Sequence, residues 1–368
     1  KDKGFEYFVI DCGWYKEEGI PWDIAMGDYH VSHDLFPEGL EKTVEAIREA
    51  GMKPGIWFEI ENVGSAARAY HETDHLLKRD GKPLTTTMRR FWDMRDPWVN
   101  NYLTEKVIGT LQKYDFSYMK IDYNDTIGLG CDGAESLGEG LRQNMNASYE
   151  FIEQVKREVP GIVLENCASG GHRLEPLMMG ACSMASFSDA HETPEIPIIA
   201  ANLHRAILPR QNQIWAVIRK EDSLKRIAYS VANTFLGRMC LSGDVTELEK
   251  DQWNVIDRGM TFYKAITPII RDGYTYRFGP EILSYRHPIG WQGILRLGDG
   301  GDGFALFHIF DGEVLEKYTI NIPEEYCFEV GEIYSDSQVE VSLNKCELSV
   351  SVTENWKAVA VYLKRINK

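Results

Sequence analysis

Short apolar runs alternate with amphipathic stretches along the first 270 residues of the chain. The runs are four to eight residues long and rich in β-branched and aromatic side chains, which is typical of buried strands. Eight of them are expected to be strands: EYFVID, KPGIWFEI, RRFWDM, FSYMKIDY, GIVLENCA, ACSMASFS, NQIWAVI and RMCLSGD. Between them, apolar residues recur three and four positions apart. Leu40, Val44 and Ile47, for example, predict a helix that ends at Gly51.

This alternation predicts an α/β fold. Eight strands alternating with helices over about 270 residues are what a (β/α)8 TIM barrel requires, so residues 1–272 are expected to form such a barrel. Thr246 and Glu249 have the spacing of a capping box that opens its last helix. A doubly wound parallel sheet is the alternative, because periodicity alone cannot show that a sheet closes into a barrel.

The pattern changes in residues 273–368, where short alternating runs follow one another without a helix between them. These runs predict an antiparallel β-sandwich as a C-terminal domain. The expected strands are ILSYRHPI, WQGILRL, FALFHIF, KYTINI, CFEVGEIY, QVEVSL, CELSVSV and AVAVYL. The GDGGDG segment at 298–303 is interpreted as a hairpin turn, since it lacks the spaced acidic ligands of a calcium loop.

Charge and cysteine content narrow the classes of partner. Acidic residues outnumber basic ones 56 to 40, a net charge of −16, which disfavours nucleic acid and anionic membranes as partners. No apolar run approaches the roughly 20 residues of a membrane span, and no signal-peptide pattern precedes the first strand. The seven cysteines form no CxxC pair and are interpreted as reduced thiols of a cytoplasmic protein. Because the first strand begins almost at residue 1, the chain is expected to be part of something longer.

Carboxylates end several of the predicted strands, and barrel enzymes place their chemistry at the carboxyl ends of strands. In KIDYN, Lys120 and Asp122 are two positions apart and therefore point to the same face. The lysine would keep Asp122 ionised, as a nucleophile requires. A structural ion pair inside the barrel is the alternative.

Asp189 has the opposite surroundings. It follows an apolar and weakly polar stretch, Met184–Ser188, that disfavours ionisation and suits a general acid. The alternative is an N-cap of the following helix. Two carboxylates whose environments differ in this way are typical of a glycosidase. Aromatic residues near strand ends could stack on sugar rings or pack the barrel rim: Trp14, Trp57, Trp92, Tyr123 and Phe187.

Five motifs in order give this sequence a resemblance to a known family: IDCGW, the LFPEGL…AGMKPGIWFE block, KIDYN, ENCASGGHR and SFSD. Together they resemble the melibiase group of α-galactosidases, the retaining glycoside hydrolases of family 36 and their family 27 relatives. The resemblance runs from residue 5 to about 270, and the predicted sandwich fits the group's C-terminal domain. It implies a retaining exo-glycosidase that releases terminal α-linked galactose or a galactose-like sugar from oligosaccharides or glycoconjugates.

The resemblance also implies roles for individual residues. Asp122 matches the family's nucleophile and Asp189 its acid/base, with carboxyl groups about 5–5.5 Å apart in a retaining enzyme. Lys120 matches a lysine that bonds the ring hydroxyls at positions 3 and 4, and Asp11 an aspartate that holds the axial 4-hydroxyl. The remaining implied contacts are the pocket-lining Trp57 and, beside the 2-position, Cys167 and Gly170.

Several positions depart from the family's pattern. The family usually carries two adjacent aspartates where this chain has Asp11-Cys12, and a tryptophan where this chain has Ser186. Cys12 would stand where the 6-hydroxyl is normally bound, provided that the chain bends at Gly13, and a thiol is a weak hydrogen-bond partner. Acceptance of α-N-acetylgalactosaminides or β-L-arabinopyranosides is therefore an alternative to strict galactose specificity.

The motifs are also compatible with a protein that is not an enzyme, namely a non-catalytic carbohydrate-binding barrel. A metal-dependent barrel hydrolase would need a set of metal ligands that this sequence does not offer. The Asp28, His30, His33 and Asp34 segment is interpreted as a solvated loop, so no metal or cofactor is expected. Family relatives often form oligomers, which leaves a homo-oligomer open. The family also usually has a large β-domain before its barrel, so the chain is expected to be truncated or to represent a minimal subgroup.

Overall fold

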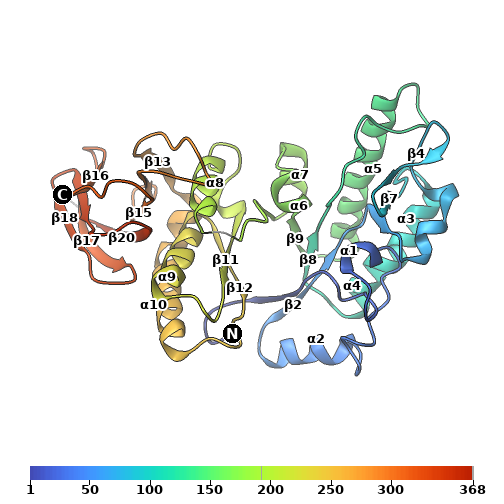
Figure 1. Ribbon diagram of the computed structural model, residues 1–368, viewed down its shortest axis with the longest axis horizontal. Coiled ribbons are helices and arrows are strands. Elements are labelled where there is room, and N and C mark those ends of the chain that lie inside the picture. The colour runs from blue at the N-terminus through green and yellow to red at the C-terminus, as the bar shows by residue number, and fades with distance from the viewer. Residues whose placement is uncertain (192, 367–368) are drawn as a thin grey trace. The chain divides into compact units, whose positions relative to one another are not determined.

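Five parallel strands form the sheet of the first half of the chain. The computed structural model describes residues 1–191 and 193–366, and they divide into two units, Lys1–Ala185 and Ser186–Lys368 (Figure 1). The strands are hydrogen-bonded in chain order: β1 (Tyr7–Ile10), β2 (Lys53–Phe58), β8 (Tyr118–Ile121), β9 (Val163–Asn166) and β10 (Met184–Ser186). The order matches the prediction of consecutive parallel strands joined by helical crossovers.

Helices and short turns fill the crossovers of this unit. They are α1 (Trp22–Ala25), α2 (Leu40–Glu49), α3 (Pro97–Leu103), a π-helical turn (Thr104–Ile108), α4 (Gly109–Lys113), α5 (Leu137–Glu158), α6 (Ala168–Gly171) and α7 (Pro176–Ala181). Helix α2 buries Leu40, Val44 and Ile47 and ends before Gly51, whose φ is 76°, as predicted. Helix α5 begins at the N-cap Ser136, whose side chain accepts a bond from the amide of Glu139.

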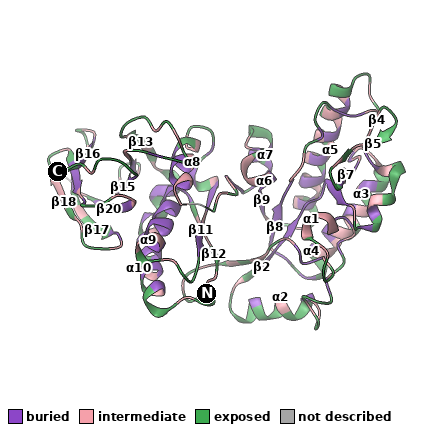
Figure 2. Cartoon of the chain, in the orientation of Figure 1, coloured by how far each residue is buried: buried purple, intermediate pink, exposed green. Residues whose placement is uncertain are grey.

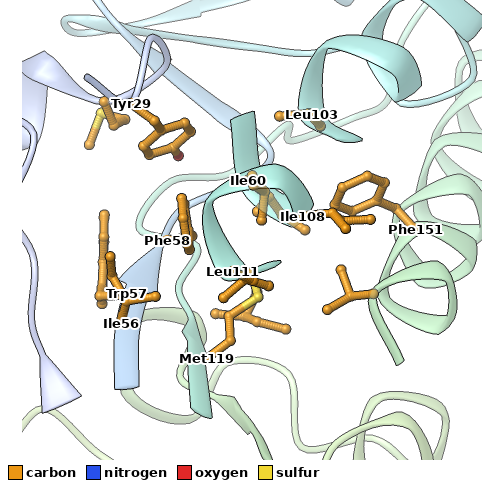
Figure 3. Packing of buried hydrophobic residues seen from close by; sticks show 14 of the residues in the cluster. Tyr29, Ile56, Trp57, Phe58, Ile60, Leu103, Ile108, Leu111, Met119 and Phe151 are labelled. Atoms are coloured by element: carbon orange, nitrogen blue, oxygen red, sulfur yellow. The ribbon is translucent and has the colours of Figure 1, made fainter. Parts of the chain in front are cut away.

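Buried apolar side chains separate the sheet from these helices. Met119 of β8 and Phe58 of β2 are fully buried, as are Leu111 of α4 and Phe151 of α5. Figure 3 shows these side chains gathered in one cluster, and Figure 2 shows the buried residues that follow the strands. Because alternate strand residues point to opposite faces, packing of Met119 against the helices leaves Lys120 and Tyr118 on the other face.

The predicted third barrel strand, RRFWDM, is wrong. Its ordered part, β7 (Arg89–Phe91), pairs antiparallel with β3 (Asn62–Gly64) and β6 (Thr85–Thr86), and β2 pairs directly with β8. Polar contacts explain why this segment pairs outside the parallel sheet. The Arg89 guanidinium donates to the Glu59 carboxylate, and the Arg90 guanidinium donates to the Tyr70 carbonyl. The described residues therefore contain seven parallel strands rather than eight. A further two-stranded hairpin joins β4 (Lys78–Arg79) and β5 (Lys82–Pro83).

The second unit begins with helices and two parallel strands. Strand β11 (Asn212–Ile218) pairs in parallel with β12 (Arg238–Gly243), and the helices are α8 (Glu195–Leu203), α9 (Leu224–Asn233) and α10 (Lys250–Asp272). Helix α10 starts at Glu249, which forms a capping box with Gln252. The predicted box at Thr246 is therefore displaced by one helical turn. The side chains of Glu249 and Gln252 satisfy the first amides of the helix where it actually begins.

Antiparallel sheets complete this unit. One has the order β13 (Tyr274–Phe278), β14 (Trp291–Leu297), β15 (Gly303–Ile309), β20 (Lys357–Arg365) and β17 (Phe328–Tyr334). The other has the order β16 (Tyr318–Asn321), β19 (Glu347–Ser351) and β18 (Glu340–Asn344). Their facing side chains share one core, including Leu295, Phe307 and Leu348. Residues 298–302 link β14 to β15 as a hairpin, as predicted.

One predicted sandwich strand is wrong. Residues 282–289 form bends and a single bridge at Ile289 instead, and Leu283 in this segment is 89% exposed. The first antiparallel strand is β13, which directly follows α10. A domain boundary between residues 272 and 273 stays a prediction. Among the described helices, none combines the length and the apolar character needed to cross a membrane.

Candidate active site

Asp122 follows directly on strand β8, and three donors hold its carboxylate. The Trp57 indole Nε1 donates to Oδ2 at 3.1 Å, while the amides of Tyr123 and Ser169 donate to Oδ1 at 2.8 and 2.9 Å. The side chain is 6% exposed, so these bonds fix its orientation in a largely dry setting. Hydrogen bonds to the charged form stabilise an ionised carboxylate. Asp122 therefore has the surroundings that a carboxylate nucleophile needs.

Lys120 and Asp11 form an ion pair beside this carboxylate. The Lys120 ammonium lies 3.1 Å from both carboxylate oxygens of Asp11. Burial lowers the pKa of Lys120, but the charges of Glu165, Asp11 and Asp122 outweigh burial and raise that pKa above its ordinary value. Lys120 thus stays charged, and the Asp11 side chain, 57% exposed, forms the accessible end of the pair.

Cys12 continues the chain from Asp11 into a bend. Gly13 has a φ of 92°, in the left-handed region that favours glycine, and the amide of Cys12 donates to Asp11 Oδ1 at 2.9 Å. The bend that the sequence required at Gly13 is therefore present. Burial, reinforced by the Asp11 charge, raises the pKa of the Cys12 thiol to about 12. Cys12 is consequently a neutral, weakly polar group at neutral pH.

Trp57 supports the site through its indole N–H. Its ring stacks on Tyr15 at a centroid distance of 5.7 Å, meets Trp22 edge-on, and is 1% exposed. The aromatic residues proposed for sugar stacking are all buried: Trp14, Trp57, Trp92, Tyr123 and Phe187. This burial agrees with packing, the second of the two interpretations that their positions allowed, while a contact of Trp57 with the sugar stays a prediction.

The turn after β9 brings Cys167 and Gly170 to the same strand ends. The amide of Cys167 donates to the carbonyl of Ile121 at 2.8 Å, one residue before Asp122. Four consecutive residues of this turn have positive φ, namely Ala168 (47°), Ser169 (55°), Gly170 (70°) and Gly171 (103°). The left-handed backbone points the Ser169 amide at Asp122, a contact that the residue types of the motif do not reveal.

Two glutamates at the end of β2 have structural surroundings. Glu59 is fully buried and accepts bonds from Arg89 Nη1 at 3.1 Å and from the amide and side chain of Asn124 at 2.7 and 3.0 Å. Burial raises the pKa of Glu59, and Asp122 adds to this while Arg89 opposes it. Glu61 pairs with Arg173. These partners come from distant parts of the chain, so no local spacing predicts them.

Asp189 belongs to the second unit, beyond the end of β10. Its side chain is exposed, and the nearby Ala190 amide donates to the Ser188 hydroxyl at 3.0 Å. The N-cap interpretation of Asp189 is wrong, because α8 begins at Glu195 with Pro194 as its N-cap. The carboxyl separation between Asp122 and Asp189 stays a prediction.

Potential metal ligands are scattered rather than clustered. The described part of the chain contains no group of three or more histidine, cysteine, aspartate or glutamate residues arranged to hold a metal ion. Asp28 instead accepts bonds from the amides of Arg68 and Ala69 at 2.7 and 3.0 Å.

Comparison with known proteins identifies sequences and structures to which this chain is related. The sequence model of melibiase matches residues 1–273, well over half of the chain. The chain belongs to the melibiase family. Among curated members, it is 27% identical over 300 residues to α-galactosidase 1 of Pediococcus pentosaceus, covering 77% of this chain and 40% of that protein. It is 26% identical over 284 residues to the α-galactosidase of Escherichia coli, covering 74% and 39%.

Solved structures of melibiase relatives show the same fold. The family 36 α-galactosidase AgaA of Geobacillus stearothermophilus, solved with 1-deoxygalactonojirimycin, superposes with a TM-score of 0.82 at 18% identity, covering 99% of this chain and 52% of that one. The α-galactosidase of Lactobacillus brevis gives a TM-score of 0.82 at 20% identity, covering 100% and 51%. The chain thus has the α/β barrel followed by antiparallel sheets. It spans about half the length of these relatives.

Proposed function

We propose that this melibiase-family chain carries the catalytic machinery of a retaining exo-α-galactosidase. The substrate is a terminal α-linked galactose, or a galactose-like sugar, on an oligosaccharide or glycoconjugate. One observation carries the proposal: Asp122 ends a parallel strand with its carboxylate oriented by three donors and flanked by the charged Lys120. A preorganised carboxylate of this kind suits attack on an anomeric carbon.

Relatives support the choice of sugar. AgaA of Geobacillus stearothermophilus has been solved with raffinose and with stachyose, and curated members of the family are α-galactosidases. The exposed Asp11 carboxylate and the Lys120 ammonium beneath it offer a charged acceptor and donor for neighbouring sugar hydroxyls. Cys167, Gly170 and Trp57 line the same strand ends and are proposed to enclose the sugar ring.

The proposed reaction has two steps. Asp122 attacks the anomeric carbon while Asp189 protonates the departing glycosidic oxygen, which forms a covalent glycosyl-enzyme and releases the aglycone. Asp189 then accepts a proton from water as the water oxygen attacks the same carbon, which frees Asp122 and the sugar with retained configuration. Each step inverts the anomeric centre once, so the two together preserve it.

A panel of nitrophenyl glycosides tests the proposal. We expect release of nitrophenol from the α-galactoside, and the panel also contains the α-N-acetylgalactosaminide and the β-L-arabinopyranoside. Hydrolysis of none of the three, by protein shown to be folded, would contradict the enzyme assignment. Saturable sugar binding without turnover would then favour the non-catalytic carbohydrate-binding barrel.

Cys12 favours a second candidate substrate, the β-L-arabinopyranoside, which lacks the hydroxymethyl group. The neutral thiol beside Asp11 cannot supply the charged acceptor that a second aspartate would offer to a 6-hydroxyl. We expect Cys12→Asp to raise the ratio of kcat/KM for the α-galactoside over the arabinopyranoside about tenfold or more, since hydrogen bonds to charged groups contribute roughly 1.5–3 kcal/mol. Cys12→Ser, which changes the atom but adds no charge, is the matched control. An unchanged ratio in Cys12→Asp would assign Cys12 to packing.

Location and oligomeric state are proposed on fewer observations. A cytoplasmic location accords with the seven cysteines, each of which is a free thiol in the structure. A homo-oligomeric state is proposed from the resemblance alone, and light scattering of the purified chain would measure it.

A further inference from the structure

Arg173 and Glu61 form a buried ion pair next to the proposed nucleophile. Glu61 is 1% exposed and Arg173 is 7% exposed. Both terminal nitrogens of the guanidinium donate to the carboxylate, Nη2 at 3.1 Å, and the Ser148 hydroxyl donates to it at 2.8 Å. Such a pair adds little net stability, because removing both charges from water offsets their attraction. The position of the Arg173–Glu61 pair in the fold indicates a role other than stability.

Arg173 contacts both segments that hold Asp122. Its guanidinium lies 3.8 Å from the centre of the Tyr123 ring, and Tyr123 is the residue directly after Asp122. Its carbonyl accepts a hydrogen bond from the side chain of Asn166, the last residue of β9. Arg173 therefore connects the far end of the turn after β9 to its beginning and to the side chain of the residue that follows the nucleophile.

The turn between these ties is strained. Residues 168–171 all have positive φ, and two of them, Ala168 and Ser169, carry a side chain. Residues with a Cβ rarely adopt this region, and such strain persists only where the surroundings enforce it. The hydrogen bond from the Cys167 amide to the Ile121 carbonyl fixes one end of the turn. Arg173 fixes the other end. This geometry places the Ser169 amide nitrogen 2.9 Å from Asp122 Oδ1.

We propose that the Arg173–Glu61 pair is a positioning device that holds the left-handed turn closed and thereby keeps the Ser169 amide on the nucleophile. The inference rests on the proposed function of Asp122. Both side chains are buried, so the role proposed for them is to position the turn rather than to bind the sugar. Losing the pair releases the turn, removes one of the three donors to Asp122 and leaves its carboxylate less well oriented.

Steady-state kinetics of Arg173→Met and Arg173→Lys test this role. With the nitrophenyl glycoside that the wild-type protein hydrolyses best, we expect Arg173→Met to lower kcat about 100-fold, the size of effect that a misplaced catalytic group produces. KM changes far less, because the sugar contacts remain. Arg173→Lys keeps the charge but not the planar fork, and recovers part of the lost kcat.

Arg95→Met is the matched control. Arg95 also forms a two-point pair with a carboxylate in the first unit, donating to Asp93 at 2.8 and 2.7 Å. This variant loses an ion pair of the same type and is expected to keep the wild-type kcat and KM. Thermal unfolding of each variant is measured alongside the kinetics. If Arg173→Met does not fold, the kcat of Arg173→Lys tests the proposal instead.

The inference is overturned if folded Arg173→Lys and Arg173→Met keep the wild-type kcat, or if folded Arg95→Met lowers kcat equally. Failure of the proposed function looks different: the wild-type protein itself then hydrolyses none of the glycosides.

Discussion

Asp122→Ala is expected to lower kcat for an α-galactoside by about 10⁴-fold or more, the scale of loss seen when a covalent nucleophile is removed. Substrate binding should persist, because Lys120, Asp11 and Trp57 remain. Added azide can enter the space that the carboxylate leaves and attack the anomeric carbon from the same side. The expected product is the β-galactosyl azide, of inverted configuration, measured by chromatography and proton NMR.

A neighbouring aspartate provides the control for this variant. Asp125 lies three residues further along and accepts bonds from the Thr86 hydroxyl and the Thr126 amide. Asp125→Ala removes a carboxylate from the same loop and is expected to retain most of the activity, with no azide product. Wild-type turnover in Asp122→Ala would place the nucleophile elsewhere.

Asp189→Ala is expected to show a loss that depends on the leaving group. A dinitrophenolate leaves without protonation, so the first step survives with that substrate. The alkoxide leaving group of raffinose needs a proton, and its hydrolysis should fall by about 10²–10⁴-fold. Azide should accelerate the second step and give the α-galactosyl azide, because the covalent intermediate still forms on Asp122. The two variants thus yield azides of opposite configuration.

Asp244→Ala is the control in the second unit. Asp244 follows strand β12 and lies 3.5 Å from Arg219, so it is also an aspartate at the end of a parallel strand. Any loss in Asp244→Ala should be equal for both leaving groups. If Asp189→Ala also lost equally on both, the acid/base assignment would be wrong.

The sequence predicted the elements of the fold whose signal is local. The periodicity of Leu40, Val44 and Ile47 and the apolar runs of β2 and β8 depend on which face each residue buries, and they appear where expected. RRFWDM failed because its length and aromatic content resemble a strand of the parallel sheet. Only the distant Glu59, which binds Arg89, explains why it pairs antiparallel elsewhere.

The candidate site likewise contains residues that the sequence could identify and contacts that it could not. Asp122 and Lys120 could be selected from their alternation along one run of sequence, and their catalytic and binding roles stay predictions. The Ser169 amide could not be selected, since every residue has one and only the φ angles of the turn direct it toward Asp122. Glu61 lies close after β2, but its pairing with Arg173, 112 residues away, depends on the folded chain.

Covalent trapping tests the central claim most directly, namely that Asp122 is the nucleophile of a retaining galactosidase. A fluorinated galactosyl fluoride, which forms the glycosyl-enzyme but slows its hydrolysis, is incubated with the wild-type protein and the digest is analysed by tandem mass spectrometry. Trypsin cleavage after Lys120 and Arg142 releases residues 121–142, which contain Asp122, Asp125 and Asp132. We predict one added fluorosugar on this peptide, located at Asp122 by its fragments. A label on any other residue, or turnover of the α-galactoside by an enzyme that this reagent never labels, would contradict the assignment.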